Sequence, residues 1–94
     1  MKSVSYSPQA VTDLVRLREF IAEKNPTAAS RIAAELIARI DNLSRFPQMG
    51  RPVPRAPQPE TLRDMVFGRY VIRYSIHAEN LIILRIWHHY ENRD

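Results

Sequence analysis

The chain of 94 residues has no cysteine and only two glycines. Without thiols, neither a disulfide framework nor a thiolate metal site can form. The lone glycine of "MGRP" excludes a phosphate-cradling loop, which needs several glycines and a Lys-Ser/Thr ending, so Gly50 is interpreted as a turn residue. The stretch "MKSVSYSPQA" lacks an apolar signal core, and no run approaches the roughly 18 apolar residues that span a bilayer. These absences predict a cytoplasmic protein without a metal, a cofactor or a membrane segment.

The composition is that of a globular protein with an excess of arginine. Hydrophobic residues make up 45% and charged residues 26%, which is typical of a folded domain. Fourteen basic residues stand against ten acidic ones, for a net charge of +4, and only Lys2 and Lys24 are lysines. The arginine fork pairs well with carboxylate and phosphate. We therefore expect an acidic partner: nucleic acid, a nucleic-acid enzyme or an acidic protein.

Five of the seven prolines lie between Pro47 and Pro59. The segments on either side are too short to bury a core of their own without disulfides or metal, so residues 1–94 are predicted to form one domain. The proline-rich stretch is then a stiff, extended bridge inside that domain.

Two helices are predicted before this bridge. Ser7 and Asn25 are N-cap residues, and Pro8 and Pro26 occupy the first helical positions. Apolar residues then recur at helical spacing, and the second helix ends before Pro47. The short turn between them predicts an antiparallel hairpin. The two stripes are Ala10, Leu14, Leu17 and Ile21, widened by Val11 and Phe20, and then Ala29, Ile32, Ala33, Leu36, Ile40 and Leu43.

After Thr61 the apolar period changes to two. "LRDMVF", "RYVIRYSIH" and "NLIILRIWHHY" are predicted strands, the last two joined by a hairpin turn at "HAEN", and "SVSY" is a short alternating segment near the N-terminus. A small antiparallel β-sheet packed on the helix hairpin gives an α+β fold.

Strand alternation predicts an exposed face on this sheet. If Ile82, Leu84 and Ile86 point at the helices, the opposite face carries a mixture of hydrophobic and arginine side chains, which usually marks a protein partner. The residues of that predicted face are Leu81, Ile83, Arg85, Trp87 and His89, with Val71 and Arg73 beside them.

The stretch "WHHY" raises the possibility of proton transfer. Neighbouring strand residues point to opposite faces, so His88 and His89 cannot easily hold one metal ion, and packing or partner contact is the main interpretation. An acid or base role for one histidine stays open. Arginines of the bridge and sheet could hold phosphate or carboxylate groups, or could form a solvated charged face. They are Arg51, Arg55, Arg63, Arg69, Arg73 and Arg85.

The order "NPTAA", "FPQMGRP", "YVIRYSI" and "ILRIWHH" closely resembles the ParE branch of the RelE/ParE toxins, over nearly the whole chain. The resemblance implies the helix hairpin on a small sheet derived above. It also implies a toxin of a type II toxin-antitoxin module, neutralised by a cognate antitoxin whose C-terminal segment adds to the toxin as helix or strand. The antitoxin-binding residues expected on the open face are Val71, Arg73, Leu81, Ile83, Arg85 and Trp87.

The same resemblance implies one of two targets, because ParE-like members poison DNA gyrase and RelE-like members cut messenger RNA in the ribosome. We expect gyrase inhibition and no catalytic residues. Cleaving members carry an arginine where our alignment places Val71, two positions before Arg73. The expected target contacts are Arg51, Arg69, Arg73, Arg85, Trp87, His89 and Arg93.

The alternative is an mRNA endoribonuclease, and the ending "WHHY" keeps it open because cleaving members often carry basic residues with a terminal His or Tyr there. Its residues would be Arg63, Arg69, Arg73, Arg85, His88, His89 and Tyr90. No groove-reading helix accompanies the basic residues, so direct DNA binding by the toxin alone is not expected.

Overall fold

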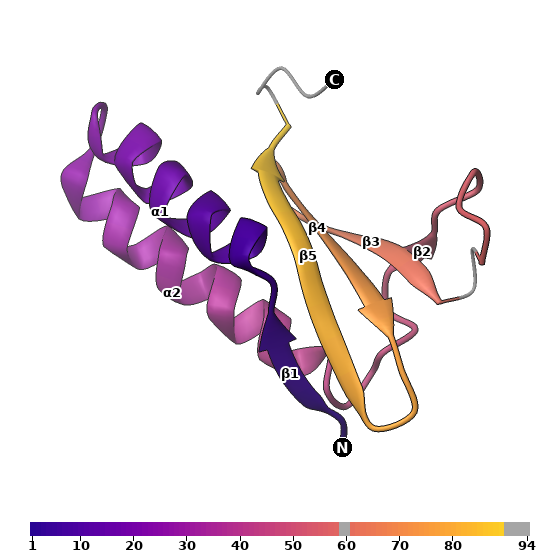
Figure 1. Cartoon of the computed structure of the whole chain (residues 1–94). Helices are drawn as coiled ribbons and strands as arrows, with labels where there is room; N and C mark the ends of the chain where they lie inside the picture. The colour runs from indigo at the N-terminus through magenta and orange to yellow at the C-terminus, as the bar shows by residue number, and fades with distance from the viewer. Residues whose placement is uncertain (59–60, 90–94) are drawn as a thin grey trace.

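The computed structural model describes residues 1–58 and 61–89, in which two helices cover one face of a five-stranded sheet (Figure 1). Helices α1 (Pro8–Ala22) and α2 (Pro26–Asn42) form the hairpin. The strands are β1 (Ser3–Tyr6), β2 (Arg51–Pro52), β3 (Leu62–Phe67), β4 (Tyr70–Ile76) and β5 (Asn80–His88), in the order β1-β5-β4-β3-β2. The predicted α+β fold is confirmed. One correction concerns β1, which pairs parallel with β5 and makes the sheet mixed, not purely antiparallel.

Both helices begin as their cap residues predict. The side chain of Ser7 accepts a hydrogen bond from the Ala10 N–H at 3.0 Å, and that of Asn25 accepts one from the Ala28 N–H at 3.1 Å. A proline follows each cap, where its missing N–H costs nothing. Neither helix of the described chain combines the length and the apolar composition that crossing a membrane would require.

The core lies between the hairpin and the central strands β4 and β5. Its side chains come from both helices and from the helix-facing side of the sheet, as the apolar stripes predict. The buried members are Ala10, Leu17, Leu36, Ile40, Leu43, Met65, Tyr70, Ile72, Tyr74, Leu81, Ile83 and Ile86. Val11 and Phe20 stay at the rim, with exposed fractions of 51% and 37%.

A bulge between β4 and β5 overturns the predicted faces of the last strand. Arg73 pairs with Arg85, but Tyr74 pairs with Ile83, so Leu84 is the extra residue and the alternation shifts there. Leu81 and Ile83 are completely buried, as is Ile86 beyond the bulge. The assignment was correct for Ile86 and wrong for the segment before it, where Leu81 and Ile83 face the helices. They do not lie on an exposed surface.

The proline-rich bridge is fastened to the sheet at its first turn. Tyr74 Oη donates to the Pro47 carbonyl at 2.6 Å and accepts from the Gly50 N–H at 2.9 Å. Arg63 Nη1 donates to the Gly50 carbonyl at 2.8 Å. A Cβ on Gly50 would lie 2.7 Å from Tyr74 Oη, so only glycine fits under the tyrosine. The bridge also contributes β2, which pairs with Arg63 and Asp64 and was not predicted.

Helix α1 closes the outer edge of β5 beyond the end of β1. Ser7 Oγ donates to the Leu84 carbonyl at 2.9 Å, and the carboxylate of Asp13 accepts from the Ile86 N–H at 2.8 Å. Arg16 Nη2 donates to the Ile86 carbonyl at 3.2 Å. Side chains of the helix thus satisfy backbone groups that a neighbouring strand would otherwise bind.

Candidate partner-binding face of the sheet

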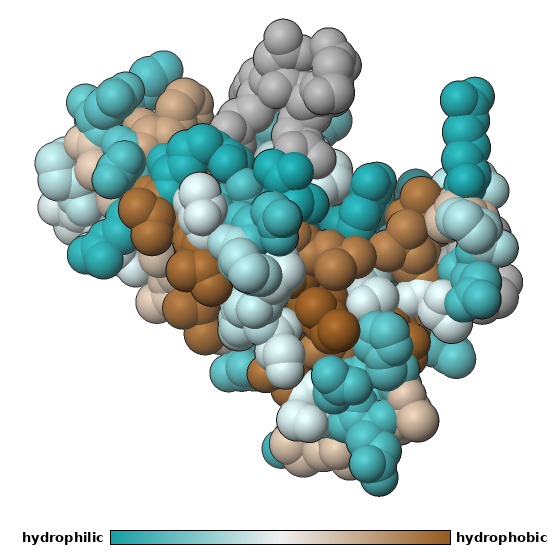
Figure 2. Space-filling view, in the orientation of Figure 1, coloured by the Kyte–Doolittle hydropathy of each residue, from teal (hydrophilic) through white to brown (hydrophobic). Residues whose placement is uncertain are grey.

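The face of the sheet turned away from the helices carries a groove between β2, the segment that follows it, and the ends of β3, β4 and β5. In Figure 2 hydrophobic residues gather over the sheet, with hydrophilic residues along their borders. Apolar surface framed by charge on one side of a small domain is typical of a site that binds another protein. The groove is lined by Arg51, Pro52, Val53, Pro54, Asp64, Val66, Val71, Trp87 and His89.

Arg73 is positioned by contacts to the two neighbouring strands. Its Nε and Nη2 donate to the two carboxylate oxygens of Asp64 on β3 at 2.8 and 2.9 Å. Its guanidinium carbon lies 5.3 Å from the centre of the Trp87 ring on β5. The hydrogen bonds that Arg73 donates to the Asp64 carboxylate raise the pKa of Arg73, which therefore stays charged. The result is a fixed acid, cation and aromatic group across three strands.

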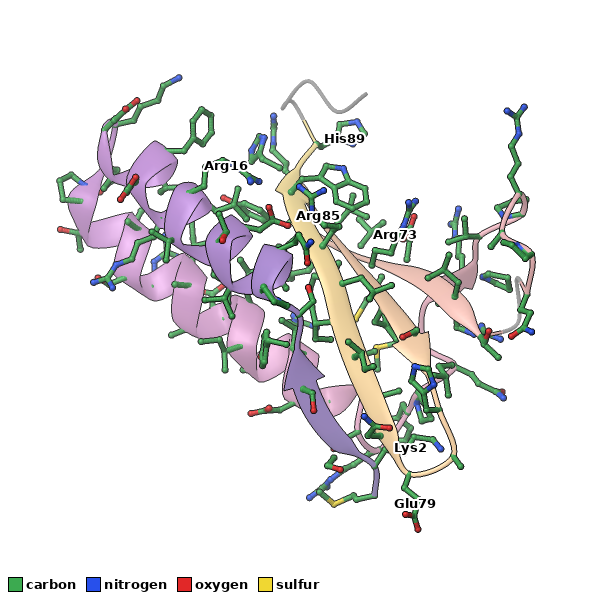
Figure 3. All side chains as sticks on the ribbon, in the orientation of Figure 1. Lys2, Arg16, Arg73, Glu79, Arg85 and His89 are labelled. Carbon is green, nitrogen blue, oxygen red and sulfur yellow. The ribbon has the colours of Figure 1, made fainter. Side chains whose placement is uncertain are left out.

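A second charged cluster lies where α1 meets β5, and Figure 3 shows Arg16 and Arg85 reaching toward each other there. Arg85 Nε donates to Asp13 Oδ2 at 2.8 Å, and Arg16 Nη1 donates to Asp13 Oδ1 at 2.6 Å. The Asp13 side chain is 2% exposed. Burial alone would raise the pKa of Asp13, but the hydrogen bonds from Arg85, the Ile86 N–H and Arg16 outweigh it and lower that pKa to about 2.

The two histidines point to different surroundings, as strand alternation predicts. The ring of His88 packs near Phe20 and Tyr70, with centroid distances of 5.7 and 5.1 Å. His89 is exposed at the end of the sheet, and its backbone N–H donates to the Arg69 carbonyl of the β3–β4 turn. Within residues 1–58 and 61–89, no three His, Cys, Asp or Glu side chains come together in a group that could hold a metal ion.

The predicted nuclease residues do not converge in the part of the chain that the structure describes. Arg63 is only 7% exposed, and its Nη1 donates to the Gly50 carbonyl. Arg73 binds Asp64 and Arg85 binds Asp13, on different strands and with different partners. His88 lies among aromatic rings. Tyr90 and Arg93 lie outside the described residues.

The residues predicted to contact a partner lie closer together than the predicted nuclease residues do. Val71 and Trp87 are directly opposed on β4 and β5, Arg73 stacks on Trp87, and Arg51 and His89 border the same groove. Arg69 lies in the exposed turn beside His89, whereas Arg85 turns toward α1.

Sequence reasoning missed two acidic residues of this region. Asp13 lies on the buried side of α1, and its helical spacing to Ala10 and Leu17 was a signal that went unused. Asp64 lies within a strand pattern. Alternation does place Asp64 on the same face as Val66, and that was the available signal.

The chain was compared with known proteins. A family model described as the ParE toxin of the type II toxin-antitoxin system parDE matches residues 4–93. Toxin RelE3 of Caulobacter vibrioides is 31% identical over 97 residues, covering 99% of this chain and 100% of that protein. Toxin RelE2 of the same species is 37% identical over 90 residues, covering 94% of this chain and 96% of that protein.

Two solved toxin-antitoxin structures share the fold. The chromosomal ParDE system of P. aeruginosa superposes with a TM-score of 0.78 at 17% identity, covering 94% of this chain and 96% of that one. The RelBE2 complex of Mycobacterium tuberculosis superposes with a TM-score of 0.69 at 25% identity, covering 93% and 96%.

Helix hairpin, mixed sheet and open face are thus the architecture of small toxins from type II toxin-antitoxin systems. Because the family model spans nearly the whole length, the chain belongs to the ParE toxin family of these systems.

Proposed function

We propose that this toxin acts by binding, with DNA gyrase as its target, and thereby blocks replication. The observation that carries the proposal is the engagement of the cationic groups that a nuclease would need. Arg63 bonds to loop carbonyls, and Arg73 and Arg85 each bond to a carboxylate. A phosphate would have to displace those partners, whereas a protein surface can use them as they stand. The resemblance to the ParE branch indicates that the bound protein is DNA gyrase.

The open face is the proposed contact region for target and antitoxin. Trp87 is the central candidate, because a large aromatic stacked by an arginine resembles the residues that dominate protein interfaces. An antitoxin covering Val71, Arg73 and Trp87 would bury the same groove and so neutralise the toxin. Three solved relatives of the fold are toxin-antitoxin complexes, which supports a partner of this kind: ParDE, RelBE2 and DinJ-YafQ.

The second candidate is ribosome-dependent mRNA cleavage. It is favoured by the name RelE of the curated relatives and by the exposed His89 at the end of β5. In that case His89 would be a general acid or base, and His89→Ala would lower the cleavage rate about a hundred- to ten-thousand-fold.

The test is inhibition of purified gyrase in a DNA supercoiling assay. We expect inhibition by the wild-type toxin and its relief by equimolar antitoxin. Trp87→Ala should weaken inhibition by about thirty-fold or more, because an anchor residue is lost. Val15→Ala, which shortens an exposed side chain on α1, is the matched control and should inhibit like the wild type.

RNA cleavage is measured in parallel by primer extension on translating ribosomes. The toxin would be a nuclease if it cleaves mRNA, if His89→Ala abolishes that cleavage, and if the wild-type toxin leaves DNA supercoiling by gyrase unchanged. If Trp87→Ala is folded but has lost both activities, the open face is the functional surface whichever target is correct.

A further inference from the structure

The outer side of the helix hairpin carries a strip of apolar side chains that is left exposed. Val11 and Val15 on α1 are 51% and 55% exposed, and Ile37 on α2 is 44% exposed. Figure 2 shows hydrophobic residues along the hairpin as well as over the sheet. Exposed aliphatic residues that gather in one place on a small domain usually mark an interface.

On α1 this strip continues to a positive charge. Val11, Val15 and Arg18 follow one another at spacings of four and three residues, so they share one side of the helix. Asp13 and Arg16, which bind the backbone of β5, lie on the other side. The strip therefore faces away from the sheet and reaches an exposed arginine toward the turn between the helices.

On α2 the strip continues to a negative charge. Ile37 and Asp41 are four residues apart and share one side of the helix. Arg39, whose guanidinium lies over the Phe67 ring of β3, is on the other side. Asp41 is exposed and lies near the end of α2 that is remote from the turn. Because the helices are antiparallel, Arg18 and Asp41 mark opposite ends of one apolar strip.

These two charges have no oppositely charged partner in the described ranges. Neither Arg18 nor Asp41 forms an ion pair within residues 1–58 and 61–89. Two further charges of α2, Arg31 and Glu35, bind each other at 3.2 Å. Glu19 is turned about 100° around α1 from Arg18, away from α2.

The two charges are placed almost symmetrically about the apolar centre. Residues equally far in sequence from the turn lie level with each other in an antiparallel hairpin, which puts Ile37 level with Val11. At a rise of about 1.5 Å per residue, Arg18 lies about 8 Å from the midpoint of Val11 and Val15, toward the turn, and Asp41 lies about 9 Å from it in the other direction. A half-turn about that midpoint therefore exchanges the two charged ends.

We propose that the outer face of the helix hairpin pairs with the same face of a second copy of this chain about a two-fold axis. Val11, Val15 and Ile37 meet at the centre. Arg18 of each copy pairs with Asp41 of the other. A surface that is apolar in the middle and oppositely charged at its two ends is complementary to itself, as an isologous dimer requires.

This dimer leaves the groove of each copy open, because the helices cover the opposite face of the sheet. The inference is therefore independent of whether gyrase is the target. A toxin that fails to inhibit gyrase yet forms this dimer leaves it intact.

The test measures self-association of the purified toxin by sedimentation equilibrium at low salt. We expect a monomer–dimer equilibrium that weakens with added salt. Arg18→Asp and Asp41→Arg should each weaken it about five- to fifty-fold, because two ion pairs become two contacts between like charges. An equimolar mixture of these two variants should associate like the wild type, because each heterodimer regains both pairs of opposite charge. Val11→Asn should weaken association about ten-fold or more, because it buries an amide at the centre.

Arg55→Asp makes the same change of charge in the bridge and is the matched control, which should associate like the wild type. Circular dichroism checks that each variant is folded. The proposal is overturned if the wild type stays monomeric at submillimolar concentration, or if mixing Arg18→Asp with Asp41→Arg restores nothing. A dimer that Val11→Asn leaves unchanged would lie on another surface. If the wild type is monomeric and Val11→Asn instead weakens antitoxin binding, the occupant of this face is the antitoxin and not a second copy.

Discussion

The carboxylate of Asp13 connects the first helix to the last strand through Arg85, Arg16 and the Ile86 N–H. A buried carboxylate with these donors is held in its charged form. Removing its charge takes away the carboxylate that both arginines share, at a site where the Asp13 side chain is 2% exposed.

Asp13 predicts an acid-sensitive component of stability. In the folded chain its pKa is lowered from 3.8, the ordinary value for an aspartate, to about 2. A carboxyl group whose pKa is lower in the folded than in the unfolded chain stabilises the fold at pH values above its unfolded-state pKa. This stabilisation is lost as the pH falls to the folded-state pKa. We expect about 2 kcal/mol to disappear between about pH 4 and pH 2. Urea denaturation of the wild type and Asp13→Asn should show their difference shrinking over that window.

Glu19→Gln is the control for this experiment, because it removes an exposed carboxylate from the same helix. If Glu19→Gln reproduces the pH dependence of Asp13→Asn, the effect belongs to net charge and not to the Asp13 cluster.

Gly50 and Tyr74 predict a coupled pair of substitutions. Gly50→Ala puts a Cβ 2.7 Å from Tyr74 Oη and 2.9 Å from the Asp64 carbonyl oxygen, so it should destabilise by about 1 to 3 kcal/mol. Tyr74→Phe leaves the Gly50 N–H and the Pro47 carbonyl without their partner, at about 1 to 3 kcal/mol. Because phenylalanine lacks the hydroxyl that the new methyl group meets, the double substitution should cost less than the sum. A chemical-denaturation double-mutant cycle that is additive would contradict this.

At the scale of the elements, the two N-caps allow a matched comparison. Ser7 and Asn25 each cap a helix, but Ser7 also donates to the Leu84 carbonyl on β5. Ser7→Ala should therefore cost about 1 kcal/mol for the cap and a further 0.5 to 1.5 for the link to the strand. Asn25→Ala should cost the cap alone. Equal losses in thermal or urea unfolding would mean that the bond to Leu84 contributes nothing to stability.

The elements also show what the sequence could and could not predict. Caps and helical spacing depend on neighbours in the chain, so Ser7 and Asn25 were correctly assigned as starts. The bulge at Leu84 depends on how β4 and β5 meet, and an apolar run such as "LIIL" reads the same in either register. Leu81 and Ile83 were therefore placed on the wrong face. The burial of Arg63 beside the Gly50 loop was not predicted, because it depends on how the bridge folds back against β3.

Of the partner face, sequence reasoning found Val71, Arg73 and Trp87 but not the residues that position them. Asp64 fixes Arg73 only because β3 and β4 place the two opposite each other. Pairing of this kind is set by three-dimensional register and cannot be derived from composition or local spacing.

At the scale of the whole molecule, the first and the last strand of the described chain lie side by side. Strand β1, from the first residues, pairs with β5, from the last. The sheet therefore combines two local hairpins, β3–β4 and β4–β5, with the β1–β5 pairing, which is remote in sequence. Folds with such pairings form more slowly than helical ones, because a large loop must close first.

This arrangement determines the order in which the contacts can form during translation. Both helices leave the ribosome before β5 (Asn80–His88), and β1 has no parallel neighbour until that strand has emerged. Asp13 gains its bonds to Arg85 and the Ile86 N–H, and Trp87 its contact with Arg73, only once this strand is present. A chain still in synthesis therefore passes through an interval in which its helix hairpin is complete but the groove between β2 and β5 is not yet formed.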